Sequence, residues 1–326
     1  MNEWRYRIAE HRGTLFALGL FVAMFAVYVA NHPAGLTANV VQTASNKGVL
    51  LAFVAMAQTL VVLTAGIDLS VGMIFILTNC LASSLVVGSP AEALFGVVVV
   101  LFAGLACGAL NGLLVIVGRL QPIVATIATG AMFFGLALLL RPFPGGSVNE
   151  DLADLVTGRL FGTIPNSLIL LLVVVLVVWV PFRRSETGRA AYAVGSNEQA
   201  AYMSGVATSR GKFAAYALSG LLASVGGLFL TFYTYTGEAA YASGSSYTLW
   251  SIAAVVLGGV SLYGGRGSAI GAIFGAFAAR TTGDMLFVFD VEPLWQPLLQ
   301  GVILMLAVSI GAFALLRLRN RLDLFE

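Results

Sequence analysis

Three ionisable side chains stand inside otherwise apolar stretches of the chain, and they limit the chemistry that it can do. Asp68 lies in "TAGIDLSVG", residues 64–72, while Arg280 and Asp284 lie four residues apart in "RTTGD". Charges in such stretches are costly, and in membrane proteins they usually serve a solute, an ion or a proton. The spacing of Arg280 and Asp284 puts both on one helix face and allows an internal ion pair, so the two residues either pair structurally or line a pathway.

Uncharged hydrogen-bonding groups occur in the same apolar stretches. Amides and hydroxyls at these positions suit a hydroxyl-rich solute, but they serve helix association equally well. The residues are Gln58, Asn79, Asn111, Thr126 and Thr129.

No pattern in the chain is typical of an enzyme. There is no nucleophile elbow and no HExxH pair. The nearest approach to a phosphate loop is "GVATSRGKF" at 205–213, in which five residues instead of four precede the Gly-Lys pair and Phe213 replaces Ser or Thr. We therefore expect no catalytic residue, metal or cofactor in this chain, and any energy source must lie elsewhere.

The composition predicts an integral membrane protein with a single all-α domain over residues 1–326. Of the 326 residues, 59% are hydrophobic and only 10% are charged, and the mean hydropathy is +0.94. A helix needs about 20 apolar residues to cross a bilayer. The apolar tracts predict about ten spans, of which the first is retained and is not a signal peptide: 14–30, 48–65, 71–87, 93–117, 121–140, 167–182, 213–235, 249–263, 268–289 and 295–316.

Basic residues predict the orientation of these spans, because cytoplasmic segments are enriched in Lys and Arg. With both termini in the cytoplasm, thirteen basic residues fall inside and three, Lys47, Arg141 and Arg159, fall outside. Arg280 then remains as the one basic residue within a span. The pattern is that of a multi-pass membrane protein.

Two segments between spans are long enough to bind a partner. The outer one, 141–166, has mixed charge and could receive an external protein. In the inner one, 183–212, Ser196 and Gln199 form a capping box and Gly205 can end a helix, which predicts a short helix over 197–204. So short a helix is not stable alone. It packs on its own domain or lies in a groove of a partner.

The apolar tract that contains Asp68 must break, because one helix over residues 48–87 would be about 60 Å long, twice the apolar thickness of a bilayer. Gly66 can end the second span, and Asp68 or Ser70 can cap the third. A broken helix can also present its N-terminus to a pathway, so the role of Asp68 is structural, functional or both.

Glycines at four-residue spacing predict close helix packing in two places. They are Gly104, Gly108 and Gly112, and Gly267, Gly271 and Gly275.

Four blocks, in order, resemble one family over nearly the whole chain: the membrane permease subunits of ribose-type sugar ABC importers. They are "TAGIDLSVG", "NGLLVIVGRLQPIVATIATG", "TGRAAYAVGSNEQAAYMSGV" and "SIAAVVLGGVSLYGGRGS". The resemblance implies a permease dimer, homodimeric or formed with a paralogous subunit, with alternating access at its interface. It also implies cytoplasmic ATPase subunits that bind ATP and Mg, and a periplasmic solute-binding protein.

The resemblance makes the segment 188–205 the element that couples the permease to its ATPase. The candidate coupling residues are Gly195, Asn197, Glu198, Ala200, Ala201 and Gly205. The candidates for the pathway or the helix break are Gly66, Asp68, Ser70, Gln58, Asn79, Asn111, Thr126, Arg280 and Asp284.

Two positions depart from the family and leave the solute open. Members usually have a Glu-Leu-Asp pattern where this chain has Thr248, Leu249 and Trp250, and many have Asn-Asn-Gly where it reads "RTTGD". A monosaccharide or related polyol is the expected solute, with a nucleoside, a branched-chain amino acid or a furanoside signal as alternatives. Outside the ABC class, a proton-coupled carrier using Asp68 or Asp284, or a channel, also fits a polytopic chain.

Overall fold

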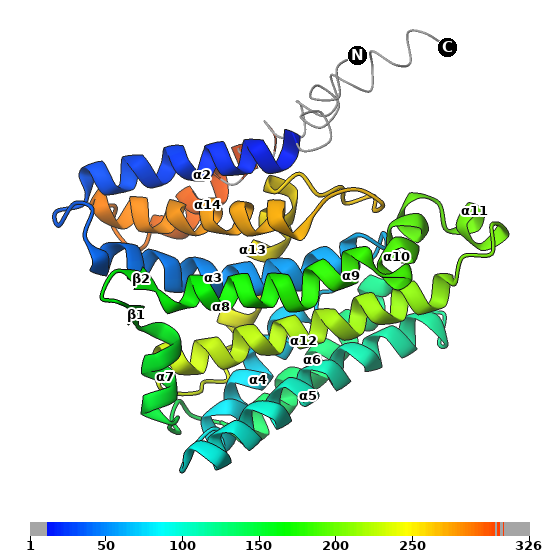
Figure 1. Cartoon of the computed structure of the whole chain (residues 1–326), viewed down its shortest axis with the longest axis horizontal. Coiled ribbons are helices and arrows are strands. Elements are labelled where there is room, and N and C mark those ends of the chain that lie inside the picture. The colour runs from blue at the N-terminus through cyan, green and yellow to red at the C-terminus, as the bar shows by residue number, and fades with distance from the viewer. Residues whose placement is uncertain (1–11, 304, 307–308, 310–326) are drawn as a thin grey trace, which may run out of the picture.

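The computed structural model describes residues 12–303, 305–306 and 309, which fold mainly into a bundle of helices (Figure 1). The elements of the first half are α2 (Arg12–Asn31), α3 (Ala38–Val62), α4 (Val71–Leu85), α5 (Pro90–Ile116), α6 (Pro122–Leu140), α7 (Glu150–Thr157), β1 (Arg159–Leu160) and β2 (Ile164–Pro165). Those of the second half are α8 (Asn166–Val174), the π-helical turn η1 (Val175–Trp179), α9 (Val180–Arg184), α10 (Glu186–Ser196), α11 (Glu198–Met203), α12 (Thr208–Thr234), α13 (Tyr241–Leu257) and α14 (Ala269–Val288).

The prediction of an all-α membrane protein is confirmed by this architecture. Among the described residues, six helices are long and apolar enough to cross a bilayer, counting α8 to α9 as one, and α4 and α13 are shorter apolar helices. In the described part of the chain, helices lie at nine of the ten predicted ranges. Of the tenth, 295–316, residues 296–303 are helical and most of the rest lies outside the described residues. The number of crossings and the side of the termini stay predictions.

Helices α3 and α13 begin well before the predicted spans because their first turns are polar. Thr37 caps α3 by accepting a hydrogen bond from the amide of Val40, and α3 then starts ten residues before the apolar tract at 48–65. Gln42 and Asn46 both donate to the carbonyl of Thr157, so these polar side chains have partners in the fold. A hydropathy profile does not predict this turn, because it takes no account of hydrogen bonds to partners that are distant in the sequence.

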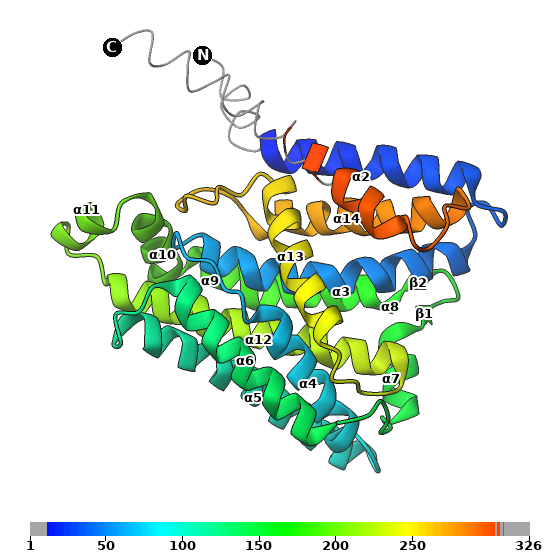
Figure 2. The same cartoon turned by 180° about the vertical axis from the view of Figure 1, so that it is seen from behind.

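The bundle has two distinct ends (Figures 1 and 2). One carries α10 and α11, and we call it the α11 end. The other carries α7 and the antiparallel hairpin of β1 and β2, and we call it the α7 end. Neither α7 nor α10 was predicted; both have a side-chain cap, from Asn149 and Ser185 respectively.

Helix α3 forms the centre of the bundle and is buried along most of its length. Helices α12 and α14 pack against it, α5 lies outside α12, and α2 lies outside α14. At the contact of α5 with α12, a Cβ on Gly108 would lie 2.2 Å from the carbonyl oxygen of Tyr216, so only glycine allows these backbones to approach. The first predicted glycine stripe is thereby confirmed.

The second glycine stripe is only partly helical. Gly271 and Gly275 pack against the end of α13, where a Cβ would lie 2.2 Å and 2.1 Å from the carbonyl oxygens of Gly258 and Ala254. Gly267 lies before α14 with φ at 126°, so it serves a loop conformation that other residues rarely adopt.

Candidate translocation and coupling site

The predicted helix break is present between α3 and α4, but Gly66 does not end α3 in the way expected. Ala65 is the residue with left-handed backbone, at φ 60°. The amide of Gly66 donates to Val61 O at 3.3 Å and that of Ala65 to Val62 O at 2.9 Å, which is a Schellman arrangement. Gly66 is needed instead for space, since a Cβ there would lie 2.8 Å from the hydroxyl of Tyr216.

Asp68 holds the first residues of α4 in place. Its Oδ1 accepts hydrogen bonds from the amide of Ser70 at 2.8 Å and from the hydroxyl of Ser70 at 2.6 Å. Ser70 occupies the N-cap position without a side-chain capping bond of its own, so the cap is supplied by Asp68. Both residues are fully buried, and Asp68 Oδ2 has no hydrogen-bond partner among the described residues.

Side chains of α5 and α6 continue this hydrogen bonding. Asn111 Nδ2 donates to Ser70 Oγ at 2.7 Å, and Thr129 Oγ1 donates to Asn111 Oδ1 at 2.6 Å. We call Asp68, Ser70, Asn111 and Thr129 the break network. Beside it, the amide of Leu69 donates to Thr126 Oγ1 at 3.0 Å. These hydrogen bonds join three segments of the sequence, while Asp68 Oδ2 stays without a partner in the described residues.

The coupling segment forms two helices where one was predicted. Asn197 is the N-cap of α11, with its side chain accepting from the amide of Ala200 at 2.9 Å. The capping box predicted for Ser196 and Gln199 is therefore wrong, because Ser196 ends α10 and donates to Tyr192 O at 3.0 Å. The prediction that Gly205 ends the short helix is confirmed, since Gly205 has φ at 76° and follows the last turn of α11.

The end of α10 lies directly on the end of α3. A Cβ on Gly195 would lie 1.9 Å from Leu63 O and 2.4 Å from Gly265 N, which are both backbone atoms. Leu63 O accepts a hydrogen bond from the amide of Gly265 at 3.0 Å. The coupling segment, the last turn of α3 and the loop before α14 therefore meet within van der Waals distance, next to the break that leads to Asp68.

A tyrosine fastens α10 to the same loop. The hydroxyl of Tyr192 donates to Gly267 O at 2.7 Å. Burial raises the pKa of Tyr192 above that of an exposed tyrosine, although the nearby charge of Arg183 opposes this effect. The phenol is therefore protonated at neutral pH and keeps its donor.

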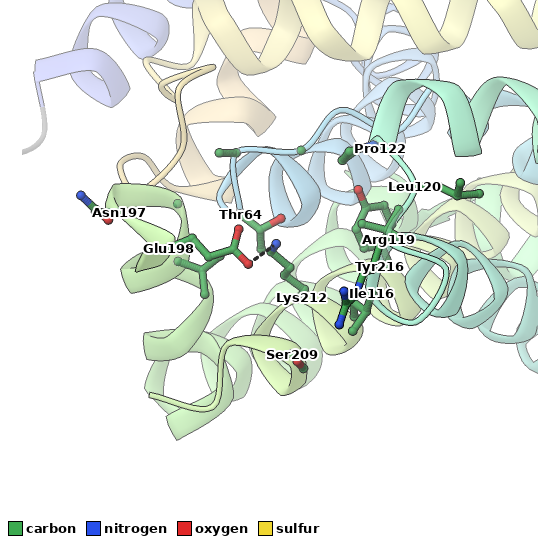
Figure 3. Close-up of a pocket in the computed structure, with 15 residues that line it drawn as sticks. Thr64, Ile116, Arg119, Leu120, Pro122, Asn197, Glu198, Ser209, Lys212 and Tyr216 are labelled. Carbon is green, nitrogen blue, oxygen red and sulfur yellow. Dashed lines mark hydrogen bonds and ion pairs between the residues drawn. The ribbon is translucent and has the colours of Figure 1, made fainter. Parts of the chain in front are cut away.

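A cavity of about 630 Å³ opens at the α11 end, between the coupling segment and the break (Figure 3). Glu198 of α11 and Lys212 of α12 form an ion pair of 2.5 Å on one side of it. Arg119 and Tyr216 lie on the other side, as Figure 3 shows. The remaining lining residues are Thr64, Ala65, Gly66, Val115, Ile116, Leu120, Pro122, Val194, Gly195, Asn197 and Ser209.

The structure brings together only part of the predicted site. Gly66, Asp68, Ser70, Asn111 and Thr126 meet at the break, and Gly195, Asn197 and Glu198 line the adjacent cavity. The other coupling candidates differ in exposure: Ala201 is buried, whereas Ala200 and Gly205 are exposed. Their roles in transport stay predictions.

Two candidates lie away from the break. Asn79 hydrogen-bonds Thr231 Oγ1 at 2.8 Å and accepts from the amide of Glu238 at 2.9 Å, which fastens α4 to α12 and to the chain after it. Gln58 is fully buried in α3, and within the described chain neither of its amide atoms has a hydrogen-bond partner.

The ion pair that helical spacing allows between Arg280 and Asp284 is absent among the described residues. Asp284 Oδ1 instead pairs with Lys47 Nζ at 2.8 Å. Lys47 was expected to lie outside the spans; because α3 starts early, this residue is helical and faces α14. Arg280 lies in a separate cavity with Tyr247 and Trp250.

Sequence reasoning missed several residues that line these sites. Tyr216 and Lys212 carry no motif, and only the packing of α12 places them at the cavity. Thr248, where the resembling family has an acid, accepts a hydrogen bond from the amide of Gly72 at 3.1 Å and is buried between α13 and α4. Thr248 and Trp250 could have been singled out from the sequence, because both stand where the resembling family has other residues.

Comparison with known proteins agrees with this arrangement. A family model described as "Branched-chain amino acid transport system / permease component" matches residues 39–308. The chain belongs to this family. It is thus a multi-pass membrane component of a transport system, as its apolar helices also indicate.

Curated relatives cover most of this permease. A ribose import permease of Bacillus subtilis is 34% identical over 89% of this chain and 90% of its own length. Its Escherichia coli K12 counterpart is 36% identical over 79% and 81%. A fructose import permease of Rhizobium meliloti is 32% identical over 80% and 74%. No solved structure matches the chain.

Proposed function

We propose that this permease is the membrane subunit of an ATP-driven, binding-protein-dependent importer for a monosaccharide or related polyol, in a bacterial inner membrane. ATP and Mg bind to separate ATPase subunits, and a periplasmic protein delivers the solute. Two permease subunits, identical or paralogous, surround the pathway and alternate between outward and inward openings.

The contact of Gly195 with Leu63 carries this proposal. An ATPase that binds α10 and α11 would push on the last turn of α3, because the backbones touch there without an intervening side chain. The turn leads directly into the break and to Asp68, and the break network links that movement to α4, α5 and α6. Closure of the ATPases would thereby change the packing of these helices around the pathway.

The exposed tip of α11 supports an ATPase as its partner. Tyr202 and Met203 are 70% and 79% exposed, so this short helix presents apolar side chains beside the charged pair of Glu198 and Lys212. An apolar helical tip with a polar rim suits insertion into a groove. The excess of basic residues in the segments around α10 supports a cytoplasmic position for this end.

The functions of the relatives support a sugar as the solute, since those named above are ribose and fructose import permeases. A furanoside signal stays an alternative solute, because a further relative, 33% identical over 89% of this chain, is named an autoinducer-2 import permease. Nucleosides and branched-chain amino acids are the others, the latter through the family description.

Transport by proteoliposomes with the permease, its ATPase and its binding protein tests this proposal. We expect ATP-dependent uptake that vanadate stops, and loss of coupling in Glu198→Ala and Gly205→Val. A Cβ on Gly205 would meet no atom within 4 Å, but the backbone there is left-handed, so Gly205→Val strains α11 locally. Gly135→Ala, in open space on α6, is the matched control. Unchanged uptake and ATP hydrolysis in folded Glu198 and Gly205 variants would overturn the coupling role.

A proton-coupled carrier predicts the opposite inhibitor pattern. Uptake that a protonophore abolishes and vanadate leaves intact, with ATP present, would replace the ABC proposal. The ion pair of Asp284 with Lys47 and the two hydrogen bonds to Asp68 Oδ1 argue against either carboxylate as a freely exchanging proton carrier.

A further inference from the structure

A second cavity, of about 290 Å³, lies between α3, α13 and α14, and we call it the Arg280 cavity. Arg280 lies near the middle of α14, remote from both helix ends. The other lining residues are Leu51, Ala242, Ser243, Ser246, Tyr247 and Trp250. The volume is near the lower limit for small-molecule sites.

The positive charge of Arg280 has no counter-charge in the described part of the chain. The nearest acid along its helix, Asp284, is occupied by Lys47 at 2.8 Å. The ion pairs among the described residues use Lys47 and Lys212, and Arg280 Nε is buried without a hydrogen-bond partner. An arginine within a membrane bundle is costly unless it meets an anion or water.

The wall opposite Arg280 is suited to a sugar ring. Ser243, Ser246, Tyr247 and Trp250 recur at helical spacing, so one face of α13 presents two hydroxyls and two aromatic rings. Within the described residues, neither Ser243 nor Ser246 makes a side-chain hydrogen bond, so both hydroxyls are available to a ligand. Phe75 packs on Tyr247 with ring centroids 4.5 Å apart and fixes that ring. Aromatic rings pack on the C–H face of a sugar, and free hydroxyls bond its oxygens.

We propose that the Arg280 cavity is a solute subsite for a monosaccharide that carries a carboxylate, a uronate or an aldonate. The guanidinium fork matches a planar carboxylate with two parallel hydrogen bonds. One arginine balances one negative charge, whereas a phosphate dianion would leave a second charge unbalanced. This inference rests on the proposed function and narrows its substrate class to acidic sugars.

Binding to the full-length permease in lipid nanodiscs tests the inference by saturation-transfer NMR with D-glucuronate, D-galacturonate, D-glucose and D-galactose as probes. We expect each uronate to bind at least tenfold more tightly than its neutral counterpart. Arg280→Gln should remove that difference, Arg280→Lys should retain part of it, and Trp250→Ala should weaken both sugars. Arg159→Gln, an exposed arginine of the hairpin, is the matched control.

Equal binding of uronate and neutral sugar by the wild type would overturn the inference, and so would a preference that survives in Arg280→Gln. Light scattering of the same samples measures whether the permease is a dimer. If the wild type does not bind uronate and Arg280→Gln dissociates the dimer, the inference is overturned and the guanidinium belongs to a subunit contact. The binding assay needs no ATPase. An importer that is ATP-driven but ignores uronates overturns only this inference, while uronate binding without ATP-dependent uptake overturns only the proposed function.

Discussion

The break network and the Arg280 cavity both place ionisable side chains inside the helical bundle, but they treat the charge differently. Asp68 is fully buried, and one of its oxygens accepts two hydrogen bonds from Ser70, which Asn111 and Thr129 extend into α5 and α6. Arg280 lines a cavity, and its Nε has no partner in the described residues. The hydrogen bonds to Asp68 Oδ1 hold the start of α4, although Oδ2 has no partner in the described residues, whereas Arg280 lies beside a cavity and is available to a ligand.

We propose that this difference divides transport between the two regions. The break network lies beside the contact between α10 and α3, so it is suited to pass on movement from the coupling segment. The Arg280 cavity lies farther along the bundle, with free hydroxyls and aromatic rings, so it is suited to contact solute. Substitutions in the first should uncouple ATP hydrolysis from uptake, and those in the second should change which solute is carried.

Gly195→Ala should have the largest effect on the coupling region. The new Cβ would lie 1.9 Å from Leu63 O, so the end of α10 must move away from α3. We expect uptake to fall at least 100-fold in proteoliposomes, while the variant still assembles with its ATPase. Gly135→Ala, which meets no atom within 4 Å, should transport normally. Normal uptake by Gly195→Ala would show that this contact does not couple the two subunits.

Asn111→Leu should destabilise the break network. The change removes the donor to Ser70 Oγ and the acceptor for Thr129 Oγ1, so two buried hydroxyls lose a partner. Ser70 Oγ still donates to Asp68 Oδ1, and Thr129 Oγ1 still donates to Ala125 O, so each lost hydrogen bond costs about 0.5–1.5 kcal/mol. Thermal unfolding in detergent should show a lowered Tm, and Asn111→Gln, which keeps an amide, should recover part of it. An unchanged Tm in Asn111→Leu would mean that the network contributes no stability.

Lys47→Met should act on the Arg280 cavity, since it frees Asp284 to turn toward Arg280 one helical turn away. Their spacing on α14 permits the ion pair that Lys47 prevents in the wild type. Uronate binding should weaken about tenfold, because the guanidinium gains an internal counter-charge. The double variant Lys47→Met with Asp284→Asn should regain wild-type uronate affinity. Unchanged binding in the single variant would contradict the view that Arg280 is free because Asp284 is occupied.

Asp68→Asn should have the smallest effect. An amide oxygen can accept both hydrogen bonds from Ser70, so the cap of α4 survives the loss of charge. We expect uptake within about threefold of the wild type, and a larger loss in Asp68→Ala, which removes the acceptor. Abolished uptake in a well-folded Asp68→Asn protein would give the charge itself a role in transport.

Sequence patterns predicted the helices well where apolar length decides the structure. They failed at the first turns of α3 and α13, where polar side chains are accommodated, in α3 by distant partners such as the Thr157 carbonyl. They also placed the left-handed residue of the break at Gly66, although Ala65 adopts it. The hydrogen bonds of the surrounding turn fix that position, and glycine preference alone does not.

The candidate site was predictable only in part, because sequence patterns give the polarity and spacing of residues but not the contacts between helices. Asp68, Ser70 and Asn111 were selected by their polarity in apolar tracts, and the structure joins them. The pairing of Arg280 with Asp284 was inferred from helical spacing, which gives the neighbours on one helix but not the competitor on another. Lys47 is that competitor, and only the packing of α3 on α14 brings it to Asp284.

The amount of solute transported per ATP hydrolysed tests the division of roles most directly. It should be measured in proteoliposomes with the complete importer, using D-glucuronate and D-glucose, for Gly195→Ala and Arg280→Gln side by side. We predict that Gly195→Ala lowers this ratio for both solutes, whereas Arg280→Gln lowers it for glucuronate alone. A fall for both solutes in both variants, or for neither, would contradict the division of coupling and solute binding between the two regions.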